Sequence, residues 1–234
     1  MQSFAALNLK SSTLRWQAGV VLAVIAGLLL VPAIARAGGN GNGGGGSTDV
    51  VKVEEDWELD VGTPNTDDSA PQLTFLISPT GDVSSYYAVF TVNQRLTLDS
   101  VGGLQLQIWN GESLLSSTTF AGTSSLNNSG EKIQWTTRMS LSSGGTLTVE
   151  VASSHGGSNE WGNFDLTTSA STNLSNLNGY DISGTVSGNN SGIDFGNTRV
   201  SQIVLQAIRT FTGTGNNTKS TSQLGAAKTI YSYP

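Results

Sequence analysis

Apolar and polar side chains alternate with a period of two along most of the chain beyond residue 49. Between residues 50 and 61, Val53 and Trp57 have one parity, and Glu54 and Asp56 have the other. A β-strand places these two sets on opposite faces. Further candidate strands are 73–77, 86–92, 104–109, 133–141, 147–151 and 200–211. The consecutive apolar residues at 203–205 predict that the last strand is buried on both faces.

Turn-forming residues separate these segments. Asn110-Gly111 is a hairpin signal, and Ser143-Gly144-Gly145 lies between two alternating runs. Segments rich in Gly, Asn and Ser, which we expect to be loops, are 123–130, 153–159 and 183–192. Beyond residue 37 no segment has the 3.6-residue period of a helix, and no repeat of fixed length is present. The pattern predicts an all-β protein, an antiparallel β-sandwich or jelly roll.

The N-terminal segment has the three parts of a secretory signal peptide. Lys10 and Arg15 precede the apolar run 18–31, which is followed by the small-residue site Ala35-Arg36-Ala37. The run is shorter than the roughly twenty apolar residues that span a membrane. We therefore expect cleavage after Ala37, no membrane insertion afterwards, and a secreted protein in the medium, at the cell surface or in the periplasm.

The rest of the chain divides by composition. Residues 38–48 read GGNGNGGGGST, a flexible linker with no side chain able to bury apolar area. The sandwich domain is expected at 49–213. The polar segment 214–234 is expected to be a loose tail until Ile230 and Tyr231.

Charge and cysteine content exclude several classes of function. Three of the eleven basic residues and none of the seventeen acidic residues lie in the signal peptide, so the remainder has a net charge of −9. Such a chain repels nucleic acid and anionic membranes. It has no cysteine and a single histidine, His155, so disulfides, a zinc site and a His-dependent catalytic triad are not expected.

Two resemblances bear on fold and family. Three segments together resemble the middle of a concanavalin A-like (laminin G-like) jelly roll. They are Gly102-Gly103-Leu104-Gln105-Leu106-Gln107-Ile108-Trp109, Trp135-Thr136-Thr137-Arg138-Met139 and Gly145-Thr146-Leu147-Thr148-Val149-Glu150-Val151. Four short segments are similar to a family of uncharacterised exported bacterial proteins. They are Trp57-Glu58-Leu59, Val61-Gly62, Ala70-Pro71-Gln72 and Trp161-Gly162-Asn163-Phe164. The first resemblance implies a fold, and neither implies an activity.

One short motif is similar to an enzyme strand. Glu58-Leu59-Asp60-Val61 resembles the start of the strand that carries the carboxylates of jelly-roll β-glucan hydrolases. Gly62 and Thr63 occupy the positions where the second acid would fall, so nothing is placed to protonate a leaving group. We therefore expect no enzymatic activity, and glycoside hydrolysis is the third choice of function.

Acidic residues are concentrated between residues 49 and 68, with eight in twenty positions. Oxygen ligands grouped in this way suit Ca²⁺, and the loop acids Asp67 and Asp68 are the candidate ligands. The preferred alternative is that the charges on the first strand keep a sheet edge from pairing with another chain. No cofactor is expected otherwise.

Trp109 is the most informative aromatic residue for function. By alternation it shares a face with Gln105 and Gln107, a combination that suits stacking on a sugar ring and hydrogen bonding to hydroxyls. Arg138 and Glu150 join this face if their strands are neighbours of the first. The alternative is that Trp109 caps the core. The sequence thus predicts a protein that binds an extracellular glycan or matrix component, and the rival is a structural or cell-surface subunit without a small ligand.

Overall fold

Two antiparallel β-sheets lie face to face in the computed structural model. The structure describes residues 48–62, 71–94, 102–120, 126, 130–154, 157–214 and 217–233, all within one unit, Gly44–Pro234. The predicted signal peptide, nearly all of the linker, the candidate ligands Asp67 and Asp68, and His155 lie outside the described residues.

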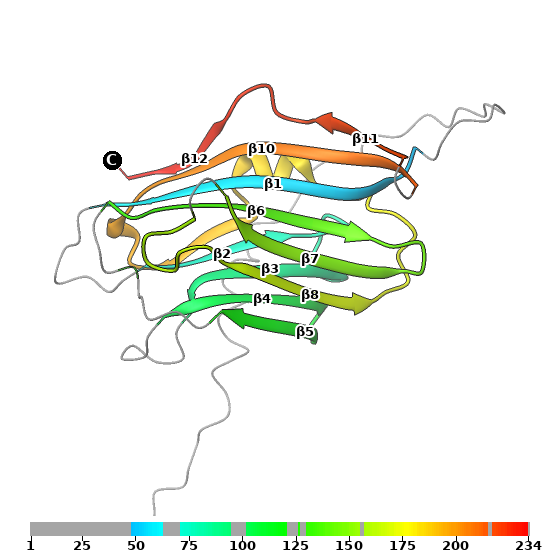
Figure 1. The fold of residues 1–234 in the computed structure, drawn as a ribbon, viewed down its shortest axis with the longest axis horizontal. Helices are drawn as coiled ribbons and strands as arrows, with labels where there is room; N and C mark the ends of the chain where they lie inside the picture. Colours follow the sequence, from blue (N-terminus) through cyan, green and yellow to red (C-terminus); the bar gives the residue numbers. More distant parts are fainter. Residues whose placement is uncertain are drawn as a thin grey trace, which may run out of the picture. The chain divides into compact units, whose positions relative to one another are not determined.

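The larger sheet, sheet A, contains the first strand of the chain in its interior (Figure 1). Its order is β11 (Asn217–Ser222), β10 (Val200–Thr214), β1 (Val50–Val61), β6 (Lys132–Leu141), β7 (Thr146–Ser153) and β8 (Asp165–Ser171). A seventh strand, β12 (Lys228–Ser232), pairs with residues 202–205 of β10, while β11 pairs with residues 209–214. The two C-terminal strands thus follow one another along the same long strand.

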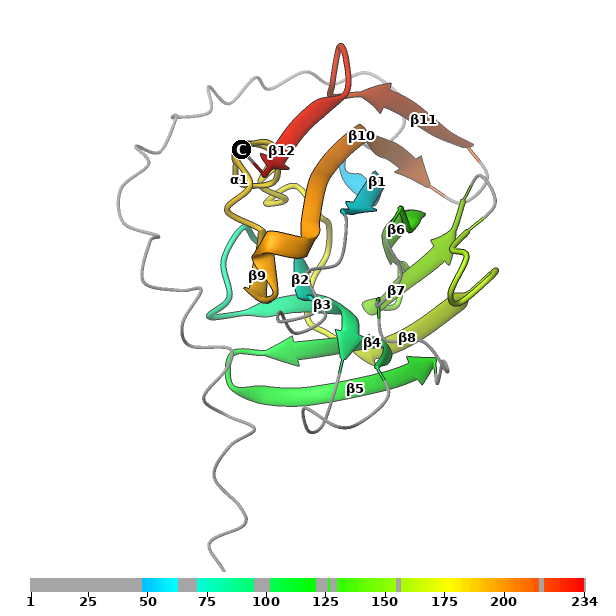
Figure 2. The ribbon, with the colours of Figure 1, turned by 90° about the vertical axis from the view of Figure 1, so that its left-hand side faces the viewer.

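The smaller sheet, sheet B, has the order β5 (Ser113–Phe120), β4 (Gly103–Asn110), β3 (Tyr86–Gln94), β2 (Gln72–Ile77) and β9 (Ser191–Phe195). Figure 2, an end-on view, shows sheet A arching beside sheet B, with β8 next to β4 and β5. One short helix, α1 (Ile182–Ser187), and a 3₁₀ turn, Asn197–Arg199, precede and follow β9. None of the helices in the described part of the chain has the length and apolar character that a membrane span requires.

Glycines in left-handed conformations lie in the turns of two hairpins, β4–β5 and β6–β7. Asn110 pairs with Ser113, which leaves the two-residue turn Gly111-Glu112 with Gly111 at φ +55°. Gly145 has φ +78° at the start of β7, and a Cβ atom there would lie 2.8 Å from the Thr172 carbonyl oxygen. Both positions suit glycine because it adopts positive φ at little cost.

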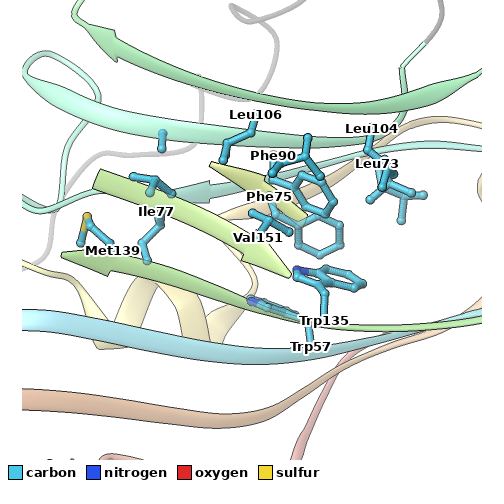
Figure 3. Packing of buried hydrophobic residues seen from close by; sticks show 14 of the residues in the cluster. Trp57, Leu73, Phe75, Ile77, Phe90, Leu104, Leu106, Trp135, Met139 and Val151 are labelled. Carbon is cyan, nitrogen blue, oxygen red and sulfur yellow. The ribbon is translucent and has the colours of Figure 1, made fainter. Parts of the chain in front are cut away.

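The core is an apolar layer between the sheets, centred on four aromatic side chains (Figure 3). Trp57 and Trp135 are cross-strand partners in sheet A, with ring centroids 6.4 Å apart. Phe75 of sheet B lies 4.9 Å from Trp135 at an interplanar angle of 73°, and Phe90 lies 5.6 Å from it. Edge-to-face contacts of this kind add to the free energy gained from burying the rings.

The sequence pattern is confirmed on fold class and on most of the core. The protein is an all-β antiparallel sandwich, and Trp57, Trp135 and Trp161 are buried as expected. Residues 203–205 are at most 6 % exposed. Val204 pairs with Glu58 on the outer face, so β10 is buried on both sides at these three residues.

Two expectations about the loops and the C-terminus are wrong, and two further strands were not predicted. Residues 214–234 are not a loose tail, because β11 and β12 are hydrogen-bonded to β10. Segment 183–192 contains most of α1 and the start of β9 rather than only a loop. The sequence pattern also missed β5 and β8, whose serine- and threonine-rich sequences have too few apolar residues to display the alternation.

We expect Trp135→Ala to lower the free energy of unfolding by about 3–5 kcal/mol, because it leaves a cavity among Trp57, Phe75 and Phe90. Trp109→Ala, the same substitution on the outer face of sheet B, is expected to cost about 1 kcal/mol, since that ring is only half-buried. Urea denaturation of both variants measures the difference. Equal losses would mean that the core is not centred on Trp135.

Candidate functional site

The outer face of sheet B carries the predicted ligand-binding residues Gln105, Gln107 and Trp109. All three alternate on β4 with the buried Leu104, Leu106 and Ile108 and are half-buried on the opposite side. Their cross-strand neighbours are Tyr87, Val89 and Thr91 on β3 and Leu114, Ser117 and Thr119 on β5. We call these nine residues the β4 face. None of the nine carries a charge.

The β4 face is apolar and aromatic at one end. Trp109 and Tyr87 are directly opposed, with ring planes within 9° of parallel and centroids 6.5 Å apart. Leu114 continues this row on β5 and is 48 % exposed. The Tyr87 hydroxyl donates to the Gly111 carbonyl oxygen at 3.1 Å, which fixes the ring against the hairpin. Burial and then the nearby charge of Glu112 raise the pKa of Tyr87, so its hydroxyl keeps its proton.

The other end of the β4 face is polar and uncharged. The amide side chains of Gln105 and Gln107 make no hydrogen bond with the described residues, so each can still donate and accept. Thr91 and Thr119 flank Gln105, and Ser117 flanks Gln107. A regular strand separates residues two apart by roughly 6.6–7 Å, which is close to the width of a pyranose ring.

Trp109 does not cap the core. Its register with Tyr87 places it on the outer face, outside the buried cluster between the sheets. Its indole Nε1 is buried and has no hydrogen-bond partner among the described residues.

Arg138 and Glu150 are not part of this face. They lie opposite each other on β6 and β7 in sheet A, and the Arg138 guanidinium donates to Glu150 at 2.6 Å. Because β4 belongs to sheet B, the condition for a shared face is not met. Both residues instead belong to an ionic network on the outer face of sheet A.

This network is built around the acidic side chains of β1. Arg209 on β10 makes two hydrogen bonds to Asp56, at 2.7 and 2.9 Å, and a third to Glu54 at 3.1 Å. From the other side Arg138 donates to Glu54 at 2.9 Å, and Lys132 contacts both Glu58 at 2.7 Å and Asp60 at 3.3 Å. The strand thus has cations on both neighbouring strands.

The position of β1 corrects the interpretation of its charges. Because β1 lies between β10 and β6, its acids do not protect a sheet edge. Basic residues on the neighbouring strands β6 and β10 neutralise them. The described residues contain no group of three or more acidic or histidine side chains arranged for a metal ion. The loop pair Asp67 and Asp68 stays a prediction.

The network lowers the pKa values of two acidic residues of β1, Glu54 and Glu58. Burial raises the pKa of Glu54, but hydrogen bonds from Arg138, Lys52 and Arg209 outweigh it and leave the pKa below its usual range. The Lys132 ammonium lowers the pKa of Glu58 despite partial burial, and Gln134 assists it. A carboxylate held in its charged form in this way is poorly suited to act as a general acid.

One acid that the sequence pattern did not single out lies in the core. Glu55 has the parity of Val53 and Trp57, faces inward and is 1 % exposed. Its carboxylate accepts hydrogen bonds from the Tyr180 hydroxyl at 2.7 Å, Trp57 Nε1 at 2.9 Å and the Thr185 hydroxyl at 3.3 Å. The sequence did contain one indication that Glu55 is buried, namely that it has the parity of the inward-facing residues of β1. Two of its three donors, Tyr180 and Thr185, come from a segment 125–130 positions away, which no local pattern reveals.

Burial raises the pKa of Glu55 to about 7, and the hydrogen bonds from Tyr180, Trp57 and Thr185 offset only part of this effect. The residue therefore anchors the start of α1 to β1 in a largely neutral form at mildly acidic pH. Its cross-strand partner Thr137 is also buried, and the Thr137 hydroxyl has no partner among the described residues.

A second buried polar cluster holds the loop before β8. Glu131 is 2 % exposed and accepts hydrogen bonds from the Ser158 hydroxyl and from the Glu160 backbone N–H, the latter at 3.2 Å. Arg199 is 3 % exposed and donates to the Leu126 carbonyl oxygen at 3.0 Å. The Ser158 hydroxyl also accepts a hydrogen bond from the Trp161 backbone N–H at 3.1 Å, which holds the buried Trp161 against the core.

The comparisons with known proteins do not extend this picture. Neither the protein-family models, nor the curated proteins, nor the solved structures contain a match to this chain. The candidate site therefore depends on its geometry alone.

Glu55→Gln is expected to change how stability depends on pH. The folded-state pKa is raised above the unfolded value, so the contribution of Glu55 is fully present below pH 4.5 and is lost as the pH rises to about 7. The glutamine keeps the shape without this titration. The stability of the variant relative to the parent should therefore rise by about 3 kcal/mol between pH 4.5 and pH 8, measured by urea denaturation.

Glu54→Gln is the matched control. Its pKa is lowered, so its contribution is present above pH 4.5 and is lost as the pH falls through the folded-state value. This variant should be less stable than the parent at neutral pH, by an amount that shrinks in acid. Parallel pH profiles for the parent and Glu55→Gln would show that Glu55 does not titrate in this range.

Proposed function

We propose that this protein is an exported β-sandwich that binds a neutral extracellular carbohydrate on the β4 face. The observation that supports this most strongly is the pairing of a half-buried Trp109 with two amide side chains, those of Gln105 and Gln107, that have no hydrogen-bond partner among the described residues. A sugar ring offers an apolar C–H surface and several hydroxyl groups, and the β4 face offers the matching surfaces side by side.

The absence of charge on the β4 face favours a neutral ligand. The protein as a whole is acidic, with a net charge of −6, and would repel an anionic polysaccharide at long range. At short range Gln105 and Gln107 can both donate and accept, which suits hydroxyl groups better than carboxylates or phosphates. The ligand class we propose is therefore a neutral glycan of the cell surface or matrix.

The fold of the sandwich is a further part of the proposal. We propose a jelly roll of the concanavalin A-like kind. Support comes from the resemblance of the segments that form β4, β6 and β7, and from two antiparallel sheets packed face to face.

Export is the third part. The basic residues, apolar run and Ala35-Arg36-Ala37 site support cleavage by a signal peptidase. We expect the N-terminus of the protein outside the cytoplasm to be Gly38 or to lie within a few residues of it. Mass spectrometry of the N-terminal peptide measures this. An intact Met1 on protein recovered outside the cytoplasm would contradict it.

Trp109→Ala is expected to abolish carbohydrate binding while leaving the fold intact. The protein is first screened on an array of neutral and acidic oligosaccharides, with and without Ca²⁺, and the strongest neutral binder is then titrated calorimetrically. Gln105→Ala and Gln107→Ala should each weaken binding by about 1 kcal/mol, the usual contribution of one hydrogen bond.

Arg138→Ala is the matched control for this experiment. The sequence pattern allowed Arg138 on the same face, but it lies on the other sheet, so its replacement should leave the affinity unchanged. A blank array at millimolar ligand, or equal losses for Trp109→Ala and Arg138→Ala, would refute binding on the β4 face.

A further inference from the structure

The free edges of the two sheets differ in how they are protected from pairing with another strand. Each of β5, β8, β9, β11 and β12 pairs with one strand only. Natural sheets usually protect such edges with a charge, a proline or a bulge. Four of these strands carry a charged residue, namely Asp165 in β8, Asp194 in β9, Lys219 in β11 and Lys228 in β12. β5, with the sequence SLLSSTTF, carries neither a charge nor a proline.

β5 does contain a bulge, but the bulge leaves most of the strand regular. The register shifts between Ile108 and Trp109, so Leu115 is the additional residue next to the hairpin turn. Beyond it, residues 116–120 pair one to one with residues 104–108 of β4. In an antiparallel ladder, half of the backbone N–H and C=O groups of this stretch point away from β4. The described backbone hydrogen bonds outside the ladders include none from these groups.

The side chains of β5 leave this edge accessible. Ser117 and Thr119 are exposed on the outer face, and both are small. Leu114 is 48 % exposed and Leu115 is 42 % exposed, and only Tyr233 is comparable among the large apolar residues of the described chain. Two exposed leucines beside an unprotected edge are a combination that soluble sheets avoid unless the edge is used.

We propose that β5 pairs antiparallel with β5 of a second copy of this chain, which extends sheet B across a two-fold axis. The outward N–H and C=O groups of the edge can pair with those of another strand. Pairing two uncharged strands avoids like-charge contacts at the interface, and two-fold symmetry satisfies both edges equally. Homotypic pairing of any other edge would bring two charged strands together.

The proposed dimer places the outer faces of sheet B of both copies on the same side. A two-fold axis between antiparallel strands is perpendicular to the sheet, so the outer faces of both copies lie on the same side. The half-buried Gln105, Gln107 and Trp109 of both copies then lie on one side of the extended sheet, with β5 and its symmetry mate between them. This consequence for ligand binding rests on the proposed carbohydrate site, whereas the dimer does not depend on it.

Sedimentation velocity of the purified exported protein, without sugar, tests the dimer over a range of concentrations up to millimolar. The double variant Ser117→Lys and Thr119→Lys places like charges across the interface and should raise the dimer dissociation constant at least tenfold. Thr167→Lys, at an exposed position of the edge strand β8, is the matched control and should leave it unchanged. Circular dichroism and thermal melting verify that both proteins are folded.

Cross-linking provides a second measurement that does not weaken the interface. The chain has no cysteine, so single cysteines at Ser116, Ser117, Thr118 and Thr119 can be oxidised one at a time. The position nearest to the two-fold axis should give a disulfide-linked dimer, because opposed Cβ atoms in a ladder lie about 4.5–5.5 Å apart. Thr167→Cys should not.

A protein that stays monomeric at all concentrations, a dimer that the two lysines do not weaken, or cross-linking by Thr167→Cys alone would each overturn the β5 interface. Because these measurements contain no sugar, their failure leaves the carbohydrate site standing. A blank glycan array likewise leaves the dimer standing.

Discussion

The stability of this protein depends on burying one face of each sheet against the other, with no disulfide to assist. Trp57 and Trp135 from sheet A and Phe75 and Phe90 from sheet B contact one another across the interior. A sandwich of this size gains most of its free energy of folding from such apolar burial. The face proposed to bind a ligand is the outer surface of a sheet that this packing holds in place.

The outer faces of the two sheets have opposite chemistry. Sheet A carries a ladder of ion pairs in which Glu54 and Asp56 are bound by Arg138 and Arg209 from the strands on either side. Sheet B carries aromatic, amide and hydroxyl groups without charge over the β4 face. The charged side chains of sheet A bind one another across neighbouring strands, whereas Gln105 and Gln107 of sheet B make no hydrogen bond with the described residues. This difference places the candidate site on sheet B.

Glu55 and the edge strand β5 show how single residues modify such a sandwich. Glu55 interrupts an inward apolar row, and its cost of burial is offset by donors from Tyr180, Trp57 and Thr185. It thereby ties the segment around α1 to the central strand of sheet A. At the opposite side of the molecule, β5 lacks the charges that the other edges have. An uncharged edge next to the β4 face connects the proposed dimer with the proposed binding surface.

The sequence alone determined the strands whose two faces differ in polarity, because alternation records burial directly. β1, β4, β6 and β7 were predicted in this way, together with the inward direction of Trp57 and Trp135 and the common face of Gln105, Gln107 and Trp109. Strands made largely of serine and threonine, such as β5, β8 and β11, have no such contrast, so their position was decided by backbone pairing with strands already in the sheet. Which strands are neighbours was also decided only in the tertiary structure. Pairing between β1 and β10 joins residues about 150 positions apart, and the separation of Arg138 from Trp109 follows from the division into two sheets. A local pattern reports which face of a strand is buried, but only the folded chain specifies what lies next to it.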